Sequence, residues 1–328
     1  MFELNASSAP SYVADFLHIP YHGIQAWELP GGVSNLVFRV RIPGHPDLVL
    51  KQSLAKLRVA ADWFSERERI FDEIDALQAL QSVAPPGAIP QVLHTDKPNF
   101  LFAMSAAEEN APTWKDLLLQ GQANTHLATQ AAQLQAAFFQ LPHLAPRFES
   151  LDRFDQLRLD PYYRATATQH PDLCHHFDAA IQQARSLRRA LTHGDWSPKN
   201  FLVNSGNKLF SIDYEVIHWG DPSFDSAFLL NHLLLKGWHN SRFQPLYAGL
   251  ARAYFQKLIQ ATKADWLEAA TLIHLPCLHL ARIDGKSPAG YLSPIAQTMA
   301  RRFARDLMQS PVATIEEVFS RQAEAFHE

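Results

Sequence analysis

Three oxygen-bearing side chains lie close together between residues 193 and 215. Asp195 and Asn200 are five residues apart, and Asp213 follows two short apolar runs separated by turn residues. Two apolar runs around a short turn predict a hairpin, which would return Asp213 to the side of Asn200. Carboxylate and amide oxygens suit Mg²⁺, and a carboxylate can take the proton of a hydroxyl. The set could therefore hold a magnesium-bound triphosphate and move a phosphoryl group, with Asp195 at the acceptor hydroxyl.

Two residues near this set are expected to support it without reacting. His193 stands two positions before Asp195, where a buried imidazole would hold the loop by hydrogen bonds. Asp225 follows Phe224 at the start of a predicted helix, where a carboxylate can also cap exposed backbone N–H groups. We interpret His193 and Asp225 as structural support for the loop.

The whole segment resembles the motif of the aminoglycoside phosphotransferase and choline kinase superfamily. In that superfamily HGDxxxxN, IDxE and GDPxFD follow one another, as they do here at residues 193–200, 212–215 and 220–225. The first of these has the spacing of the kinase catalytic loop HRDxxxxN, with Gly194 in place of the arginine. The resemblance implies an α+β, two-lobed protein-kinase-like fold, with a small antiparallel-sheet N-lobe and a mainly helical C-lobe.

The resemblance also implies a role for each matched position. It implies Asp195 as the catalytic base, and Asn200 and Asp213 as magnesium ligands. It implies that Glu215 is a nearby structural or substrate-side carboxylate. Only these matched positions are carried over to this chain.

Lys51 completes a second pattern in the N-terminal part of the chain. Residues 36–41 and 48–51 read as two strands joined by a turn rich in proline. Lys51 ends the second strand as the lysine of V-A-I-K does in protein kinases, where it reaches the nucleotide phosphates. The apolar spacing of residues 65–80 predicts a helix, and Glu73 lies beside its apolar face. The same helix contains other acids, but residues 73–77 resemble the ExxxL of the superfamily's equivalent helix, and this resemblance implies that Glu73 pairs with Lys51.

Two further segments are expected to contact the nucleotide. Gly31, Gly32 and Ser34 belong to a turn that would cover the phosphates, since glycine lets the backbone approach closely. The strand predicted at residues 100–104 would be the hinge, with Ala103 and Met104 offering backbone groups and soft apolar contact to an adenine. Residues 89–94 are expected to form a loop before it.

The N-terminal half also resembles the N-lobe of methylthioribose kinases over roughly residues 31–80. The similar segments are residues 34–40, 50–54, 57–59 and 62–63. The catalytic loop departs from that family, whose motif runs HGDLHTGS, because Asn200 ends the corresponding segment here. A methylthioribose kinase-like sugar kinase is therefore kept as an alternative.

The C-terminal part is expected to be mainly helical and to contain the substrate side. Helical apolar spacing covers residues 127–141, 173–191, 224–235, 244–262 and 265–280. Substrate-side candidates are Arg282 and Asp284, in the polar turn after the last of these segments. Further candidates follow the third motif: His232, Lys236, Trp238 and His239.

Composition agrees with a soluble enzyme of this size, and two lobes are expected. A chain of 328 residues, 47% of them hydrophobic, is long enough for two cores. We expect a nucleotide-binding lobe at residues 1–104 and a catalytic and substrate-binding lobe at residues 105–328.

A net charge of −4 without a basic stripe argues against nucleic acid as a partner. Cys174 and Cys277 are far apart and indicate thiols in a reducing compartment. Because the chain has no long apolar run, we expect no membrane partner. We also expect a cytoplasmic location and a monomer or homodimer.

These patterns predict an ATP-dependent phosphotransferase that uses Mg²⁺. It would move the γ-phosphate to a hydroxyl of a small molecule such as a sugar, an amino sugar, an aminoglycoside-like compound or an amino alcohol. A catalytically weak nucleotide-binding regulator is a second alternative, which the intact Lys51, Asp195, Asn200 and Asp213 disfavour. A metal-dependent phosphohydrolase would not explain the strand, lysine and helix of the N-terminal part.

Overall fold

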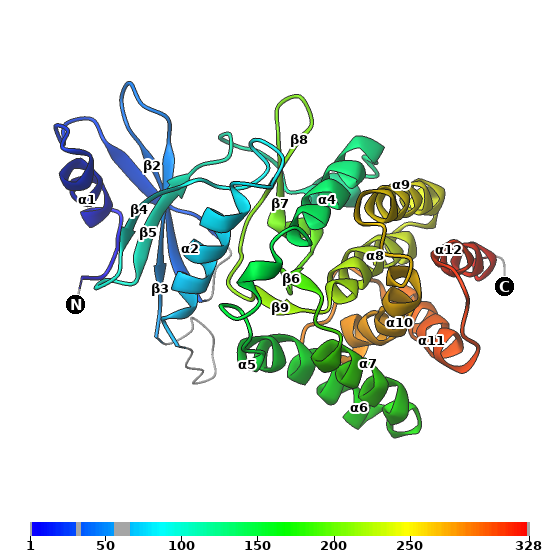
Figure 1. The fold of residues 1–328 in the computed structure, drawn as a ribbon. Coiled ribbons are helices and arrows are strands. Elements are labelled where there is room, and N and C mark those ends of the chain that lie inside the picture. Colours follow the sequence, from blue (N-terminus) through cyan, green and yellow to red (C-terminus); the bar gives the residue numbers. More distant parts are fainter. Residues whose placement is uncertain (1, 31–33, 56–65, 327–328) are drawn as a thin grey trace. The chain divides into compact units, whose positions relative to one another are not determined.

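The computed structural model describes residues 2–30, 34–55 and 66–326 (Figure 1). The chain forms two compact units. Unit 1 comprises Met1–Ser82 and Ile89–Asn110, and unit 2 comprises Val83–Ala88 and Ala111–Glu328. Unit 1 contains an antiparallel sheet and unit 2 is mainly helical, so the predicted α+β class is confirmed.

Unit 1 is built on one five-stranded antiparallel sheet with the order β1-β2-β3-β5-β4. Its strands are β1 (Gln25–Glu28), β2 (Asn35–Arg41), β3 (Leu48–Ser53), β4 (Val92–Asp96) and β5 (Leu101–Ser105). Helices α1 (Ser8–Leu17) and α2 (Arg69–Leu80) lie on opposite faces of this sheet (Figure 1). Side chains alternate along a strand, so Leu50 joins the core under α1 while Lys51 points toward α2.

The prediction of a loop at residues 89–94 is wrong for the second half of that range, because strand β4 begins at Val92. It pairs with β5 at the sheet edge, with a register shift between Val92 and His94. The ring of His94 stacks on Phe16 of α1 at a centroid distance of 4.5 Å. The strand is short, polar and preceded by Pro90, so its sequence lacks the usual strand pattern, and the neighbouring strand decides its conformation.

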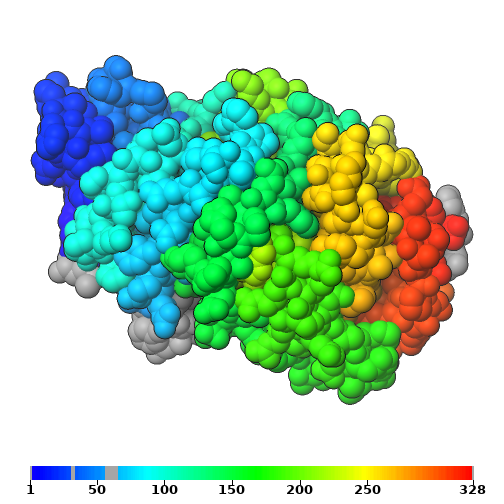
Figure 2. Space-filling model, in the orientation of Figure 1, coloured from blue at the N-terminus to red at the C-terminus, as the bar shows by residue number. Residues whose placement is uncertain are grey.

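Unit 2 packs its longer helices around α8 (Pro222–His239), which is buried along almost its whole length. Helix α8 contacts α9 (Gln244–Thr262) and α10 (Leu267–Asp284). The other helices are α3 (Trp114–Leu119), α4 (Thr125–Phe138), α5 (Asp152–Phe154), α6 (Ala165–Gln169), α7 (Cys174–Ser186), α11 (Pro294–Gln309) and α12 (Ile315–Glu324). The terminal helix α12 packs on α9, visible as red atoms beside gold ones in Figure 2. Within the described ranges, every helix is too short or too polar to span a bilayer.

Two small antiparallel ribbons in unit 2 position the motif residues. The predicted hairpin is confirmed: β7 (Phe201–Asn204) pairs with β8 (Lys208–Ser211). The second ribbon joins β6 (Ala190–Thr192) to β9 (His218–Gly220). The helix predicted at residues 173–191 therefore extends too far, since α7 ends at Ser186. Residues 190–191 instead belong to β6, because pairing with a strand far along the chain overrides the local apolar spacing.

Candidate active site

Asp225 fixes the loop that contains the catalytic motif. Its carboxylate accepts the backbone N–H groups of His193 at 2.6 Å and Gly194 at 2.9 Å. The residue stands in the first turn of α8, whose N-cap is Asp221. Burial raises the pKa of Asp225 to about 7, against the effect of these two hydrogen bonds. The beginning of a buried helix thus sets the position of the loop.

The ring of His193 holds the loop from within as a neutral group. Its Nδ1 accepts the N–H of Asp195 at 3.2 Å, and its Nε2 donates to the Ile212 carbonyl at 3.2 Å. Both contacts require a single proton on the ring, at Nε2. Burial lowers the pKa of His193 to about 4, so this neutral form persists at physiological pH. His193 therefore links the loop to the strand end that precedes Asp213.

Gly194 gives a stability prediction with an internal control. Its φ is +75°, and an added Cβ would lie 2.9 Å from Cγ1 of Val216. Gly206, in the turn between β7 and β8, has a φ of +70° but open space around its Cβ position. Gly194→Ala should lower the free energy of unfolding by roughly 2–5 kcal/mol, and Gly206→Ala by about 1–2 kcal/mol. Chemical unfolding of both variants measures the difference, and equal losses would show that Val216 does not restrict the loop.

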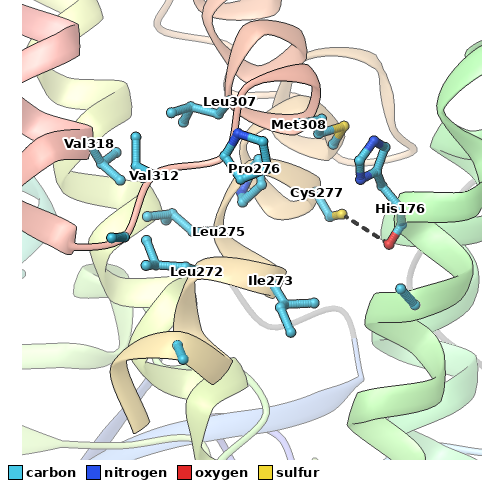
Figure 3. Close-up of a pocket in the computed structure, with 14 residues that line it drawn as sticks. His176, Leu272, Ile273, Leu275, Pro276, Cys277, Leu307, Met308, Val312 and Val318 are labelled. Atoms are coloured by element: carbon cyan, nitrogen blue, oxygen red, sulfur yellow. Dashed lines mark hydrogen bonds between the residues drawn. The ribbon is translucent and has the colours of Figure 1, made fainter. Parts of the chain in front are cut away.

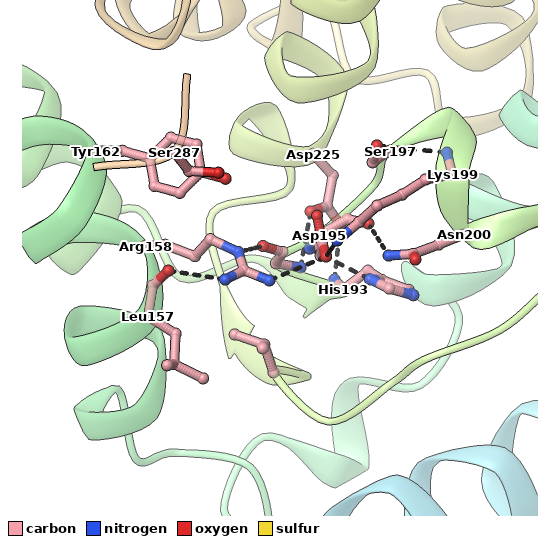
Figure 4. A network of polar contacts seen from close by, with 12 residues as sticks. Leu157, Arg158, Tyr162, His193, Asp195, Ser197, Lys199, Asn200, Asp225 and Ser287 are labelled. Atoms are coloured by element: carbon pink, nitrogen blue, oxygen red, sulfur yellow. Dashed lines mark hydrogen bonds and ion pairs between the residues drawn. The ribbon is translucent and has the colours of Figure 1, made fainter. Parts of the chain in front are cut away.

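Asp195 lies between two cations (Figure 4). Its Oδ2 is 3.1 Å from the Arg158 guanidinium and 3.0 Å from Nζ of Lys199. Arg158 also donates a hydrogen bond to the Gly194 carbonyl. Burial alone would raise the pKa of Asp195, but Lys199 and Arg158 hold it well below its usual range. The carboxylate is thus ionised at any pH in which the protein would work, ready to accept a hydrogen bond from a hydroxyl.

The contacts of Arg158 and Lys199 with Asp195 were not predicted from the sequence. Arg158 lies on a π-helical segment, Asp155–Arg164, which contains Pro161 and shows no regular apolar spacing. Its place beside the loop follows only from tertiary packing. Lys199 could have been identified, since it stands four residues after Asp195 within the motif itself.

Asn200 and Asp213 lie at the open end of the β7–β8 hairpin. The Asn200 side-chain nitrogen donates to the Asp195 carbonyl at 2.9 Å, which leaves Oδ1 as its possible metal-binding atom. The backbone N–H of Ile212 donates to the Asn200 carbonyl at 2.9 Å, so Asp213 follows directly after this contact. Asp213 has a φ of +70°, an uncommon conformation for a residue other than glycine.

The side-chain oxygens of Asn200 and Asp213 suit Mg²⁺ better than they suit a metal ion whose ligands all come from the protein. Among the described residues, no group of three or more His, Cys, Asp or Glu side chains could hold a metal ion. Mg²⁺ commonly takes one or two protein oxygens and completes its shell with phosphate and water. One amide oxygen from Asn200 and one carboxylate from Asp213 match that pattern.

Unit 1 places the predicted lysine and carboxylate together. Nζ of Lys51 lies 2.7 Å from Oε2 of Glu73, and both side chains are almost completely buried. The carbonyl of Ser34 accepts hydrogen bonds from Arg69 and from the Leu54 backbone N–H. Gly31 and Gly32 lie outside the described residues.

The predicted hinge residues belong to a strand with a partner on each side. Ala103 faces Leu50 of β3 and His94 of β4. Met104 faces Val49 and Val92 in the same two strands. Sheet hydrogen bonds therefore already occupy backbone groups of this strand, and Met104 is buried.

The substrate-side candidates fall into separate networks. The Asp284 carboxylate binds the Arg301 guanidinium at 2.7 Å and His170 Nε2 at 2.8 Å. Arg282, two residues earlier, instead contacts residues around the catalytic loop, as described below. The carbonyl of Glu215 accepts a hydrogen bond from Arg153 at 3.3 Å. Two of the remaining candidates bond elsewhere: Trp238 donates to His279, and the His239 ring contacts the Tyr291 carbonyl.

A cavity of about 350 Å³ lies elsewhere in unit 2 (Figure 3). Its lining comes from α7, α10, α11, α12 and the segment between the last two helices, and it is mostly apolar. Within it, the Cys277 thiol lies 3.7 Å from the His176 carbonyl. None of the predicted catalytic, metal-binding or substrate-side residues lines this cavity.

Comparisons with known proteins agree with this architecture. None of the curated proteins matches the chain significantly. An aminoglycoside phosphotransferase from Alicyclobacillus acidocaldarius superposes with a TM-score of 0.51 at 15% identity, covering 100% of this chain and 94% of its own. The gentamicin-APH(2")-IIa complex superposes with a TM-score of 0.51 at 14% identity, covering 97% and 99%. At such identities the likeness establishes the fold alone.

The sequence match is more specific, because residues 26–272 fit the family described as "Phosphotransferase enzyme family". This stretch includes Lys51 and the complete segment from His193 to Asp225. Since the match spans most of the chain, the protein belongs to the phosphotransferase enzyme family and is a small-molecule kinase.

Proposed function

We propose that the protein transfers the γ-phosphate of ATP, bound with Mg²⁺, to a hydroxyl of a small molecule. The observation that carries this proposal is the ionised Asp195, held by two cations next to the hairpin that presents Asn200 and Asp213. The acceptor oxygen would attack the γ-phosphorus, and the bond between the γ-phosphorus and the β,γ-bridging oxygen would break, which releases ADP. Asp195 would orient the hydroxyl and receive its proton.

The residues of the hairpin would hold the metal. Mg²⁺ bound there would neutralise the charge of the phosphates. Oδ1 of Asn200 and the carboxylate of Asp213 are its proposed ligands. Lys199 and Arg158, both in contact with Asp195, would also attract the negative charge of a phosphoryl group that reaches the acceptor there.

Unit 1 would supply the nucleotide contacts. Lys51, oriented by Glu73, would bind the phosphates, and Gly31, Gly32 and Ser34 would cover them. Because the sheet uses the backbone of Ala103 and Met104, we place the contact to the adenine edge at the end of β5. Met104 would contribute apolar contact there. Unit 1 thus corresponds to the proposed nucleotide-binding lobe and unit 2 to the catalytic lobe.

Lys51 gives the test of this function. Lys51→Met should weaken ATP binding by roughly 10–100-fold, because a buried charge-assisted contact to phosphate is lost. Lys97→Met removes a lysine exposed on the same unit and should leave binding unchanged. Titration calorimetry with ATP and Mg²⁺ measures both variants.

A turnover assay completes the test. ADP release should require a hydroxylated acceptor and should fall in Lys51→Met. Phosphate release without any acceptor, undiminished by Lys51→Met, would instead favour a phosphohydrolase. ATP binding without ADP release from any acceptor would favour the nucleotide-binding regulator.

A further inference from the structure

Lys236 is a buried basic side chain on α8 that forms no ion pair at contact distance with an acid of the described residues. Its side chain is completely shielded from solvent. Its Nζ donates to the backbone carbonyl of His232 at 3.2 Å and lies 5.7 Å from the ring centroid of Tyr291. Burial, and then the charges of Lys115 and Arg282, lower the pKa of Lys236 to about 7. Burial thus lets this amine lose its proton easily, and an acidic ligand beside it would favour the ammonium form.

Arg282 on α10 is a second cation that lacks an acidic partner in the described chain. Its guanidinium contacts only neutral groups, namely the Ser287 hydroxyl at 2.7 Å, the Ser287 carbonyl and the Tyr162 hydroxyl at 3.4 Å. Its Nε is buried without a hydrogen-bond partner, as is the hydroxyl of Tyr291. Helices α8 and α10 pack together and so bring both cations to one region. Two basic side chains and two unsatisfied polar atoms therefore lie in one part of unit 2.

This region connects directly to the catalytic loop. The Ser197 hydroxyl, two residues after Asp195, lies 3.2 Å from Nε2 of His232. The backbone carbonyl of His232 accepts a hydrogen bond from Nζ of Lys236, which lies one helical turn later in α8. His232 therefore lies between the two, with its ring at the loop and its backbone carbonyl at Lys236.

The region also lies on the acceptor side of Asp195. Tyr162 and Ser287, both in contact with Arg282, lie on one side of Asp195 in Figure 4, and Asn200 lies on the other. Since Asn200 is a proposed metal ligand, the triphosphate belongs to its side. Arg282, which contacts Tyr162 and Ser287, would thus lie on the side of Asp195 where the acceptor binds.

We propose that the acceptor carries an acidic group, a carboxylate or a phosphate, which binds Lys236 and Arg282 while its hydroxyl faces Asp195. This inference rests on the proposed function and narrows its substrate class. An acid would supply the missing counter-charge, and a guanidinium can hold its oxygens in a two-point contact. Asp284 is paired with Arg301, whereas Asp116 accepts a hydrogen bond from the Thr113 hydroxyl and attracts Lys236 only from beyond ion-pair distance.

The same charges disfavour a cationic acceptor. An amino alcohol or an aminoglycoside would bring an ammonium next to Lys236 and Arg282, and near the cations at Asp195. The aminoglycoside-like and amino alcohol acceptors expected from the sequence are therefore the less favoured members of that class. Hydroxy acids, sugar acids and hydroxylated phosphate esters are the favoured ones.

Matched acceptors separate charge from shape. Gluconate, sorbitol and glucamine differ only in the acidic, neutral or cationic group at one end of the same chain. Glycerate, glycerol and 3-aminopropane-1,2-diol repeat the series on three carbons, and glycerol 3-phosphate replaces the carboxylate with a phosphate. We expect kcat/KM from ADP release to favour the acids by at least about tenfold. The carboxylate and phosphate arms then show which acid is preferred.

Binding to variants tests the two cations without turnover. With ADP and Mg²⁺ saturating, Lys236→Met and Arg282→Gln should each weaken binding of the preferred acid by roughly 10–100-fold in calorimetry. Lys236→Arg keeps the charge and should retain much of the affinity. The control, Lys286→Met, removes an exposed lysine of the same turn that pairs with Asp160. None of these variants should change the affinity for ATP.

Each other outcome has a defined meaning. Equal turnover of neutral or cationic congeners overturns the inference and leaves the kinase assignment intact. Unchanged acid binding in Lys236→Met, absence of acid binding in the wild type, or a loss confined to ATP binding also overturns it. Acid binding that depends on Lys236, without ADP release from any acceptor, would instead support the anion site and contradict the proposed function.

Discussion

Asp195→Asn should slow phosphoryl transfer by roughly 10²–10⁴-fold while ATP binds almost as before. The substitution keeps the shape of the side chain and removes its charge. An amide cannot take the proton of the acceptor, and it no longer balances Arg158 and Lys199, each about 3 Å from it. The nucleotide contacts proposed for Lys51 and Asp213 are unaffected.

The measurement combines single-turnover transfer with calorimetry of ATP binding. Asp160→Asn is the matched control, because it makes the same change at a half-exposed carboxylate paired with a surface lysine. It should transfer phosphate at the wild-type rate. Normal turnover by Asp195→Asn with the true acceptor would remove Asp195 from the mechanism.

Asp213→Asn should remove most of the benefit of Mg²⁺ for ATP binding and turnover. The charge lost is that of a proposed metal ligand, and such a contact is worth several kcal/mol, or roughly 10²–10³-fold. Asparagine is the better replacement, because Asp213 has a φ of +70° and asparagine tolerates this conformation. Alanine would add backbone strain to the loss of charge.

The sharpest measurement compares ATP binding with and without Mg²⁺ in both proteins. The wild type should bind much more tightly with the metal, whereas the variant should show little difference. Binding without Mg²⁺ should not become weaker in the variant. A wild-type dependence on Mg²⁺ in Asp213→Asn would place the metal elsewhere.

The parts of the site that the sequence predicted depend on local pattern. The hairpin between Asn200 and Asp213 follows from two apolar runs around a turn, and its register returns Ile212 to the Asn200 carbonyl. Periodicity predicted the strand of Lys51 and the helix of Glu73, and the resemblance to kinase motifs selected these two residues, which the structure pairs. Each of these relations joins segments whose own sequences specify their secondary structure.

The parts that the sequence did not predict depend on packing between distant segments. Arg158 reaches the catalytic loop from an irregular helix that contains Pro161, for which no spacing rule applies. Strand β4 and strand β6 form because a partner strand is available, despite unfavourable or helical local patterns. The environment of Lys236 could be known only once α8 and α10 were placed together, although the residue itself was a candidate.

If an acid binds Lys236 as proposed, helix α8 would fix the distance between that acid and the catalytic loop. It contacts the catalytic loop through His232 and presents Lys236 one turn later, about 6 Å along its axis. Because the helix is buried along almost its whole length, this spacing cannot adjust to the molecule that binds. In a homologous series of hydroxy acids, activity should therefore peak at one number of bonds between the hydroxyl and the acid. Shorter and longer members should be less active, because they cannot contact Asp195 and Lys236 at the same time.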